Sequence, residues 1–348
     1  MEKEHDLTER IIYQIIQNVR PENRETQKEL LMQHFSEEDR QELLAICAGQ
    51  KLPSLMADII AKKIFSPAEH PSRLQKLLQF AADDPSIEVQ SPTANEGFVQ
   101  FEGSKKMIFD VPADLSDRRK AYTEFQVSPQ EFILMRGELY ASDMLLLQYS
   151  VPHGTAKSSM DYDHVPGILL VVLMRHSPKE FREFPSDRYI HRFYRHTADS
   201  GLSYYPRQQI VYIQLDKCLR QFVENRNGET LQQVNDADAM QLFLSAMADI
   251  NHKKVLEKAD GNAEITAIIQ EVRQMSMSAE IQAMLLAEKY AQADFNAAKS
   301  YAKREGLEEG RYQAIRNMIK YQIPKETILQ DYTPEEYEAA IKHAPIEV

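Results

Sequence analysis

FDVPADLSDRRKAYTEFQ, residues 109–126, places one acid, Asp110, in an apolar run, then a charged turn, then a second run that carries Glu124 and Gln126. The Val, Ile and Phe around Asp110 predict burial. An unpaired buried carboxylate is so costly that it is neutralised, paired or placed on a metal. Asp110 therefore needs a partner, and the second run offers one.

The second run alternates, which predicts a strand with Tyr122, Glu124 and Gln126 on one face. If residues 105–113 form a neighbouring strand, joined to it by the turn at 115–120, Asp110 faces Glu124. Two carboxylates that face each other repel unless a cation lies between them, and magnesium prefers such hard oxygen ligands. The alternative is a pair of acids exposed at a sheet edge.

The composition is that of a soluble protein of 348 residues, long enough for two domains or for one large domain with appendages. No apolar run reaches membrane-spanning length, and MEKEHDLTER is too charged to open a signal peptide. The two cysteines, Cys47 and Cys218, are far apart and read as free buried thiols. We expect a cytoplasmic protein that does not associate with membranes.

The net charge of -12 argues at first against binding to nucleic acid. Its distribution weakens the objection, because residues 1–100 carry -6, residues 101–220 carry +1 and residues 221–348 carry -7. Salt screens charges beyond about 8–10 Å, so a local surface matters more than the total. The balanced middle segment remains a candidate for contact with phosphates.

Helical and strand patterns follow one another along the chain. Apolar spacings of three and four predict helices in residues 7–50, at 53–65, at 71–82 and at 129–149. Period-two or β-rich runs predict strands between residues 86 and 127, at 188–197 and at 208–215. The almost wholly apolar run at 165–174 predicts a strand buried on both faces. Helical patterns dominate from Asp216 onward, so the order predicts an α/β or α+β core with helical extensions.

Three regions are therefore expected: a helical N-terminal extension at residues 1–52, a core at 53–222, and a helical C-terminal region at 223–348. In the last region, Gly306 and Gly310 lie four apart in a charged helix. We expect a solvated tail or an arm through which the chain forms homo-oligomers. A small DNA-binding helical pair is the alternative, which no basic patch supports.

The order of these motifs resembles the PD-(D/E)XK nuclease superfamily, in which a strand with an acid and a turn precede a strand ending in E-x-(K/Q). Within it, the chain is similar to the Rpn-like recombination-promoting nucleases, also called PD-(D/E)XK nuclease family transposases. The helix DIIAKKIF supplies Asp58, Lys62 and Phe65 of their D-x-x-x-K-x-x-F pattern. The motifs that follow in the family's order are MIFDV, EFQ, RGELYASDMLLLQY, ILLVVL, YIHRFYRHT, IVYIQLDK and, near the end, REGLEEGRY.

The resemblance covers residues 53–222, with a weaker echo at 300–345. It departs from the family in the extension at residues 1–52, in a turn that lacks the usual glycine, and in the absence of tryptophan.

The resemblance implies a restriction-endonuclease-like core, with a central mixed sheet flanked by helices, and a magnesium-dependent DNA endonuclease that hydrolyses phosphodiester bonds. Asp110 and Glu124 would bind Mg²⁺, or Mn²⁺ as a substitute, with the Phe125 carbonyl as a third ligand. Gln126 stands where the superfamily usually has lysine, and its amide can orient a water. Asp58 would be an outer catalytic acid, unless it is only a solvated helix carboxylate.

Phosphate contacts are expected from one helix and one turn. Arg136, Tyr140, Met144 and Gln148 lie four apart on one helical stripe, where Arg136, Tyr140 and Gln148 are candidates for DNA contact and Met144 for packing. Arg136 paired with a core acid is the alternative. The turn adds Arg118, Arg119 and Lys120.

The expected partner is DNA, with RNA not excluded. The alternative function is a catalytically silent DNA- or protein-binding module that keeps the nuclease fold.

Overall fold

The computed structural model describes residues 37–90, 110–149, 167–194, 207–224 and 236–342. Within this part of the chain, residues 41–285 belong to one compact unit, and residues 37–40 with 286–342 belong to a second. The helices are α3 (Glu37–Cys47), α4 (Asp58–Ile64), α5 (Pro71–Ala82), α6 (Ile133–Tyr149), α7 (Lys179–Arg182), α8 (Leu215–Glu224), α9 (Asp236–Ala248), α10 (Lys253–Ala259), α11 (Ala263–Ser276), α12 (Ala279–Lys320), α13 (Lys325–Ile328) and α14 (Pro334–Lys342). The strands are β1 (Val89–Gln90), β2 (Val111–Leu115), β3 (Lys120–Gln126), β4 (Ile168–Met174), β5 (Ile190–Tyr194) and β6 (Gln208–Gln214).

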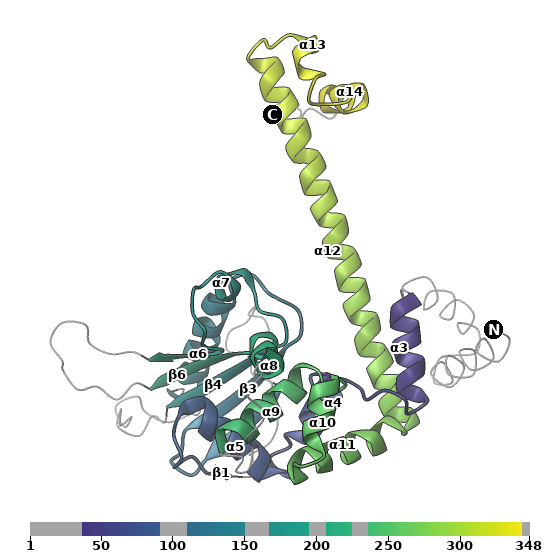
Figure 1. Cartoon of the computed structure of the whole chain (residues 1–348). Helices are drawn as coiled ribbons and strands as arrows, with labels where there is room; N and C mark the ends of the chain where they lie inside the picture. Colours follow the sequence, from purple (N-terminus) through teal and green to yellow (C-terminus); the bar gives the residue numbers. More distant parts are fainter. Residues whose placement is uncertain (1–36, 91–109, 150–166, 195–206, 225–235, 343–348) are drawn as a thin grey trace, which may run out of the picture. The chain divides into compact units, whose positions relative to one another are not determined.

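The first unit is built on a mixed sheet with the strand order β1-β2-β3-β4-β6-β5 (Figure 1). Strands β3, β4 and β6 run parallel, whereas β1, β2 and β5 each pair antiparallel with their neighbours. A mixed sheet flanked by helices confirms the fold class predicted from the sequence.

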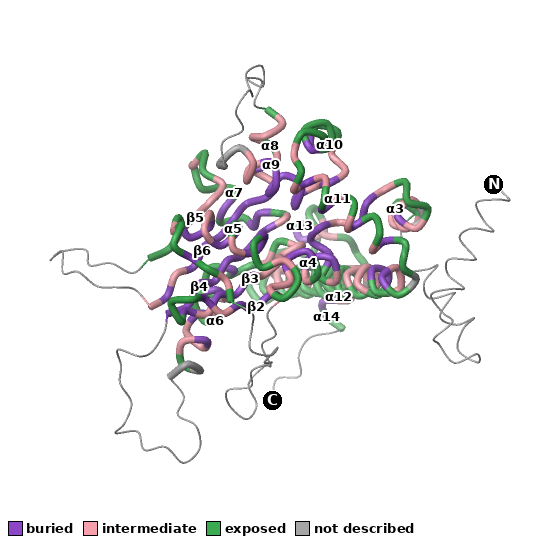
Figure 2. Tube along the Cα trace, turned by 90° about the horizontal axis from the view of Figure 1, so that it is seen from below, coloured by how far each residue is buried: buried purple, intermediate pink, exposed green. Residues whose placement is uncertain are grey.

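Strand β4 lies at the centre of the sheet, and all seven of its residues are buried (Figure 2). The run ILLVVLM has no polar position because both faces of this strand are covered by helices, which is the usual arrangement of a parallel strand. The buried residues of β3 and β6 extend this core on either side of β4.

Two helical layers cover the sheet. On one face, Leu170 and Tyr212 pack with Met144 of α6. On the other face, Val171 and Leu173 belong to a larger core that includes residues of α4, α5, α8, α9, α10 and α11. That core extends past residue 222, so α9, α10 and α11 pack with the sheet, together with Ile281 and Leu285 at the start of α12.

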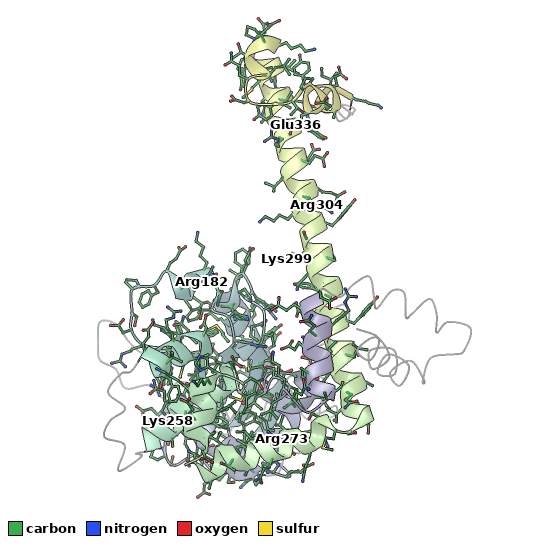
Figure 3. The ribbon with its side chains drawn as sticks, turned by 45° about the vertical axis from the view of Figure 1, so that its right-hand side comes forward. Arg182, Lys258, Arg273, Lys299, Arg304 and Glu336 are labelled. Atoms are coloured by element: carbon green, nitrogen blue, oxygen red, sulfur yellow. The ribbon has the colours of Figure 1, made fainter. Side chains whose placement is uncertain are left out.

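The second unit has a small core of its own. Ile315 at the end of α12 packs with Ile328 of α13 and Ala340 of α14. Arg311 pairs with Glu336 across this module, with Nε to Oε1 at 2.6 Å. Residues 295–311 of α12 are exposed along its length, and Lys299 and Arg304 project from this stretch (Figure 3).

One strand predicted from the sequence is shorter in the structure, and other predicted elements lie outside the described residues. The strand expected at residues 105–113 begins at Val111, which leaves Asp110 just outside it. The strand expected around GFVQFEG and the first two helices of residues 7–36 fall outside the described residues.

Candidate active site

The carboxyl ends of the parallel strands bring the predicted acids to one edge of the sheet. Glu124 and Gln126 lie near the end of β3, on the same face as Tyr122, which packs in the α6 layer. Val111 of β2 pairs with Thr123 of β3, so Asp110, one residue earlier, comes opposite Glu124. Strand pairing places opposite side chains on the same face, so the register turns these two carboxylates toward each other.

Asp110 is anchored to the end of β3. Its Oδ2 accepts a hydrogen bond of 2.8 Å from the backbone N–H of Phe125. Burial raises the pKa of the Asp110 carboxyl; the Phe125 N–H opposes that shift, the negative charge of Asp58 adds to it, and the positive charge of Lys62 lowers it again. Asp110 is therefore a partly desolvated acid with a second acid nearby.

Glu124 is the more strongly perturbed of the two. Burial, followed by the negative charge of Asp110, raises its pKa to about 8, whereas a hydrogen bond from the Asp110 backbone N–H and then the charges of Arg136 and Lys62 lower it. Its Oε1 atom is buried and has no hydrogen-bond partner among the described residues. A buried acceptor of this kind requires a proton, a water or a cation to satisfy it.

Helix α4 places one acid and one cation beside this pair. Ile60, Ala61 and Ile64 are buried on its inner side, so Asp58 and Lys62 share the outer side, where Lys62 Nζ lies 2.7 Å from Asp58 Oδ1. One turn further, the Phe65 ring stacks on Phe125 with centroids 5.5 Å apart, which fixes the helix against the end of β3.

From the sequence alone, Lys62 is one position of the D-x-x-x-K-x-x-F pattern, and no role in the site is predicted for it. Its charge acts on both Asp110 and Glu124. The pattern itself is the signal, because positions i, i+4 and i+7 share one face of a helix.

Helix α6 contributes Arg136 from the other layer. Its Nη2 donates to the Tyr140 hydroxyl at 2.8 Å, and its guanidinium lies 5.4 Å from the Tyr140 ring centroid. The positive charge of Arg136 also lowers the pKa of Glu124, so the guanidinium lies near enough to act on that carboxylate. Met144 on the same stripe is buried. Gln148 is in α6, but its side chain lies outside the described residues.

The sequence was also compared with models of protein families. The family model for the PD-(D/E)XK nuclease family transposases matches residues 55–302. The chain belongs to this family. No curated protein and no solved structure matched in the corresponding searches. PD-(D/E)XK nucleases act on nucleic acids and generally use divalent metals. The matched segment continues well beyond residue 222, where the sequence pattern predicted that the nuclease core ends.

Gln126 stands where the superfamily usually has lysine. The Gln126 side-chain N–H donates to the Ser128 carbonyl at 2.8 Å, and its backbone carbonyl accepts from the Arg175 N–H at 2.9 Å. The neighbouring Phe125 presents its N–H to Asp110, and its C=O points to the same side because both groups of a strand residue do.

The charged turn lies away from Asp110 and Glu124. Arg118, Arg119 and Lys120 lie at the opposite end of β3 from Gln126. Arg119 is buried in ion pairs with Asp84 at 2.9 Å and Asp117 at 2.6 Å.

Lys120 pairs with Asp114. Arg118 is exposed with φ of +72°, the left-handed conformation that the family's missing glycine would adopt more easily. These basic residues hold the turn together, and the structure separates them from the carboxylates.

A metal at the site would depend on few ligands. In the described part of the chain, no group of three or more His, Cys, Asp or Glu side chains could hold an ion. Asp58 is ion-paired with Lys62, so the available oxygens are those of Asp110, Glu124 and the Phe125 carbonyl. Such an all-oxygen set, with the buried Oε1 of Glu124 lacking a partner, fits a hard cation that keeps several waters.

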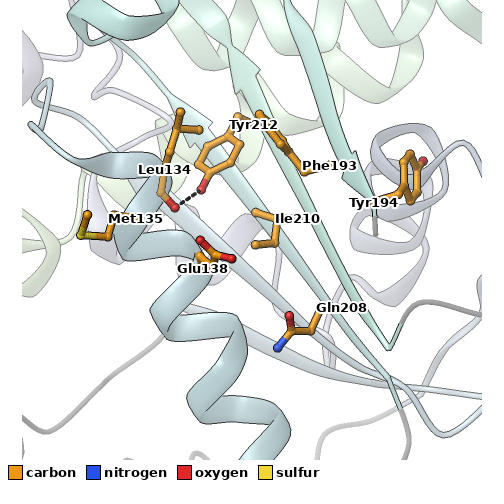
Figure 4. A pocket seen from close by; sticks show the side chains of 8 residues that line it. All are labelled: Leu134, Met135, Glu138, Phe193, Tyr194, Gln208, Ile210 and Tyr212. Carbon is orange, nitrogen blue, oxygen red and sulfur yellow. Dashed lines mark hydrogen bonds between the residues drawn. The ribbon is translucent and has the colours of Figure 1, made fainter. Parts of the chain in front are cut away.

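A pocket of about 380 Å³ lies elsewhere on the α6 face, between α6 and strands β5 and β6 (Figure 4). Tyr212, in its wall, donates to the Leu134 carbonyl at 3.4 Å. The strand register runs from Glu124 through Val172 to Tyr212, so two strand spacings separate this pocket from the acids.

Among the described residues, no helix is long and apolar enough to cross a membrane.

Proposed function

We propose that this chain is a magnesium-dependent DNA endonuclease that hydrolyses phosphodiester bonds at the carboxyl end of β3. The observation that carries the proposal is the buried Oε1 of Glu124, which has no hydrogen-bond partner in the described part of the chain and lies on the same face as Asp110. Two neighbouring acids in a partly dry site are an unfavourable arrangement unless a cation binds between them. Membership of a nuclease family supports this reading.

Asp110, Glu124 and the Phe125 carbonyl would hold the ion. A bound magnesium ion would make a coordinated water more acidic and neutralise charge on the phosphate. The hydrogen bond from the Phe125 N–H keeps Asp110 directed to this point. Mn²⁺ suits the same oxygen ligands and is expected to substitute.

Gln126 would orient the attacking water rather than supply charge. Its side-chain N–H is engaged by the Ser128 carbonyl, so its Oε1 is the atom that can accept a hydrogen bond from a water. The positive charge that the superfamily's lysine would bring is present on Lys62, whose field reaches both acids. Asp58 holds Lys62 in place and acts through it as a positioning residue.

Arg136 would bind the phosphate that is cleaved. Its guanidinium is held by Tyr140 and its charge acts on Glu124, and arginine matches the oxygens of a phosphate with paired N–H groups. A silent binding module is the second candidate, favoured by Gln126 in the lysine position and by the ion pair that occupies Asp58.

The test is plasmid nicking by the purified chain with Mg²⁺, with Mn²⁺ and with EDTA. We expect metal-dependent nicking that Asp110→Asn abolishes, while Asp260→Asn, an exposed acid at the end of α10, retains it. Asn keeps an oxygen for the Phe125 N–H, so the thermal melt of Asp110→Asn should match or exceed that of the wild type. A matched RNA substrate tests whether cleavage discriminates between deoxyribose and ribose. Metal-independent nicking, or full activity in Asp110→Asn, would contradict the proposal, and binding without cleavage would favour the silent module.

A further inference from the structure

Arg175 stands at the same edge of the sheet as the acids. It follows β4 directly, and its backbone N–H donates to the Gln126 carbonyl at 2.9 Å. Met174 pairs with Gln126 and packs in the α6 layer, so the next residue along the chain is directed to the opposite face. The Arg175 side chain therefore belongs to the α4 side of the sheet.

Its guanidinium meets a fixed hydroxyl there. Nη1 of Arg175 donates to Ser54 Oγ at 3.3 Å. Ser54 is held by a turn in which its Oγ accepts from the Met56 N–H at 3.1 Å and its carbonyl accepts from the Ala57 N–H at 3.1 Å. Leu55 and Met56 are buried, so this turn, which leads into α4, is anchored in the core.

No carboxylate pairs with Arg175 among the described residues, although its side chain is half-buried. The two buried arginines of the first unit differ in this respect, because Arg73 pairs with Glu271 and Arg119 with Asp84.

The acid Asp216 is already bound. It accepts from the N–H of Ser177 at 2.8 Å and from the N–H of Lys217 at 2.9 Å. The positive charge of Arg175 also acts on its neighbour His176, whose pKa is lowered first by burial and then by this charge. Among the described residues, the guanidinium is thus a cation at the edge of the sheet that forms no ion pair with an acid.

We infer that Arg175, together with the Ser54 hydroxyl, binds a backbone phosphate of the nucleic acid next to the one that is cleaved. The inference rests on the proposed function, because it takes Asp110 and Glu124 as the point of cleavage. A guanidinium presents paired N–H donors that match two oxygens of a phosphate, and the hydroxyl can donate to the same group. An arginine left half-buried without an acidic partner is costly, and an anionic ligand offsets that cost.

The two arginines then have complementary positions. Arg136 reaches the acids from the α6 layer, and Arg175 lies on the α4 side of the neighbouring strand. A nucleic-acid strand laid across the carboxyl ends of β3 and β4 would meet one guanidinium on each face of the sheet. This arrangement gives a role to Arg175, which has no acidic partner among the described residues.

The test measures binding apart from cleavage. A fluorescent DNA duplex is titrated with the full chain in EDTA, at several salt concentrations. We expect Arg175→Gln to weaken binding about tenfold and to lower the slope of log affinity against log salt by about one. Arg175→Lys should be intermediate, since it keeps the charge and loses the fork. The matched control is Arg273→Gln (Figure 3), at an exposed arginine of α11 that forms no ion pair with any described residue, and it should bind as the wild type does.

The outcomes separate this inference from the proposed function. Wild-type affinity and salt slope in Arg175→Gln, with or without a lower melting temperature, would assign Arg175 a structural role and overturn the inference, even if the chain cleaves DNA. A wild-type chain that binds no duplex would overturn it too. If the loss of affinity is seen but no metal supports cleavage, the phosphate subsite stands and the endonuclease proposal falls.

Discussion

Glu124 carries the largest electrostatic cost in the site. Its pKa of about 8, against an ordinary value of 4.5, means that the folded chain holds a proton that the unfolded chain releases. Stability falls with pH wherever the folded state binds more protons than the unfolded state. The contribution of Glu124 is therefore favourable below about pH 4.5 and is lost progressively as the pH rises to about 8.

We predict that Glu124→Gln removes this dependence. Without metal, the free energy of unfolding of the wild type should fall by a few kcal/mol more than that of the variant between pH 5 and pH 8, because only the wild type must ionise a buried acid. Urea unfolding in EDTA at several pH values measures it. Comparing the two chains cancels the histidines and other groups common to both. Parallel curves would mean that Glu124 ionises as freely in the folded chain as in the unfolded one.

At the scale of elements, the sequence predicts those features of the fold and the site that depend on the local pattern of residues. An uninterrupted apolar run is enough to place β4 in the centre of the sheet, and alternation with a turn is enough to set Asp110 opposite Glu124. The pairing of Arg119 with Asp84 is different, because it joins residues 35 apart and removes a predicted phosphate contact. No local pattern reports such a partner.

Arg175 shows the same limit. Its place beside Gln126 follows from the parallel pairing of β3 with β4, which a helix and a long connection separate in sequence. Lys62 is closer to being predictable, since its helical spacing from Asp58 is visible, but its effect on both carboxylates requires the packing of α4 against the end of β3.

Helix α6 can lie close to β6 because residue 137 is glycine. An added Cβ at Gly137 would overlap the Tyr212 hydroxyl and lie 3.1 Å from Tyr212 Cζ. We predict that Gly137→Ala destabilises the fold by about 1–2 kcal/mol, although alanine is the better helix former by about 1 kcal/mol, because the overlap forces the helix outward. Urea unfolding measures the loss.

The Tyr212→Phe background tests the cause. Removing the hydroxyl relieves most of the overlap, so Gly137→Ala should cost less there than in the wild type, and a double-mutant cycle isolates the coupling. Tyr212→Phe alone loses the hydrogen bonds to the Ile133 and Leu134 carbonyls, which the cycle accounts for. A stabilising Gly137→Ala would show that helix propensity outweighs packing at this position.

On the scale of the whole molecule, the proposed active site and the C-terminal helices α13 and α14 belong to different compact units. The proposed metal ligands and both arginines that we propose to bind phosphate lie within residues 41–285. The family match ends at residue 302, inside α12, so α13 and α14 are outside it. Homo-oligomerisation through these helices stays a prediction, as does the cytoplasmic location. The separate core at Ile315, Ile328 and Ala340 gives the module a stability of its own.

Ile328→Ala should therefore unfold the C-terminal module without disturbing the sheet. Ile328 is 1% exposed, and truncating such a residue typically costs about 2–5 kcal/mol, a large share of what so small a core can supply. Hydrogen exchange should show lost protection in α13, α14 and the end of α12, with β3, β4 and β6 unchanged and metal-dependent nicking retained. Tyr321→Ala, at a position 77% exposed, is the matched control and should leave all segments protected. Equal loss of protection in β4 would mean that the two units unfold as one, since stability is then shared rather than divided between two cores.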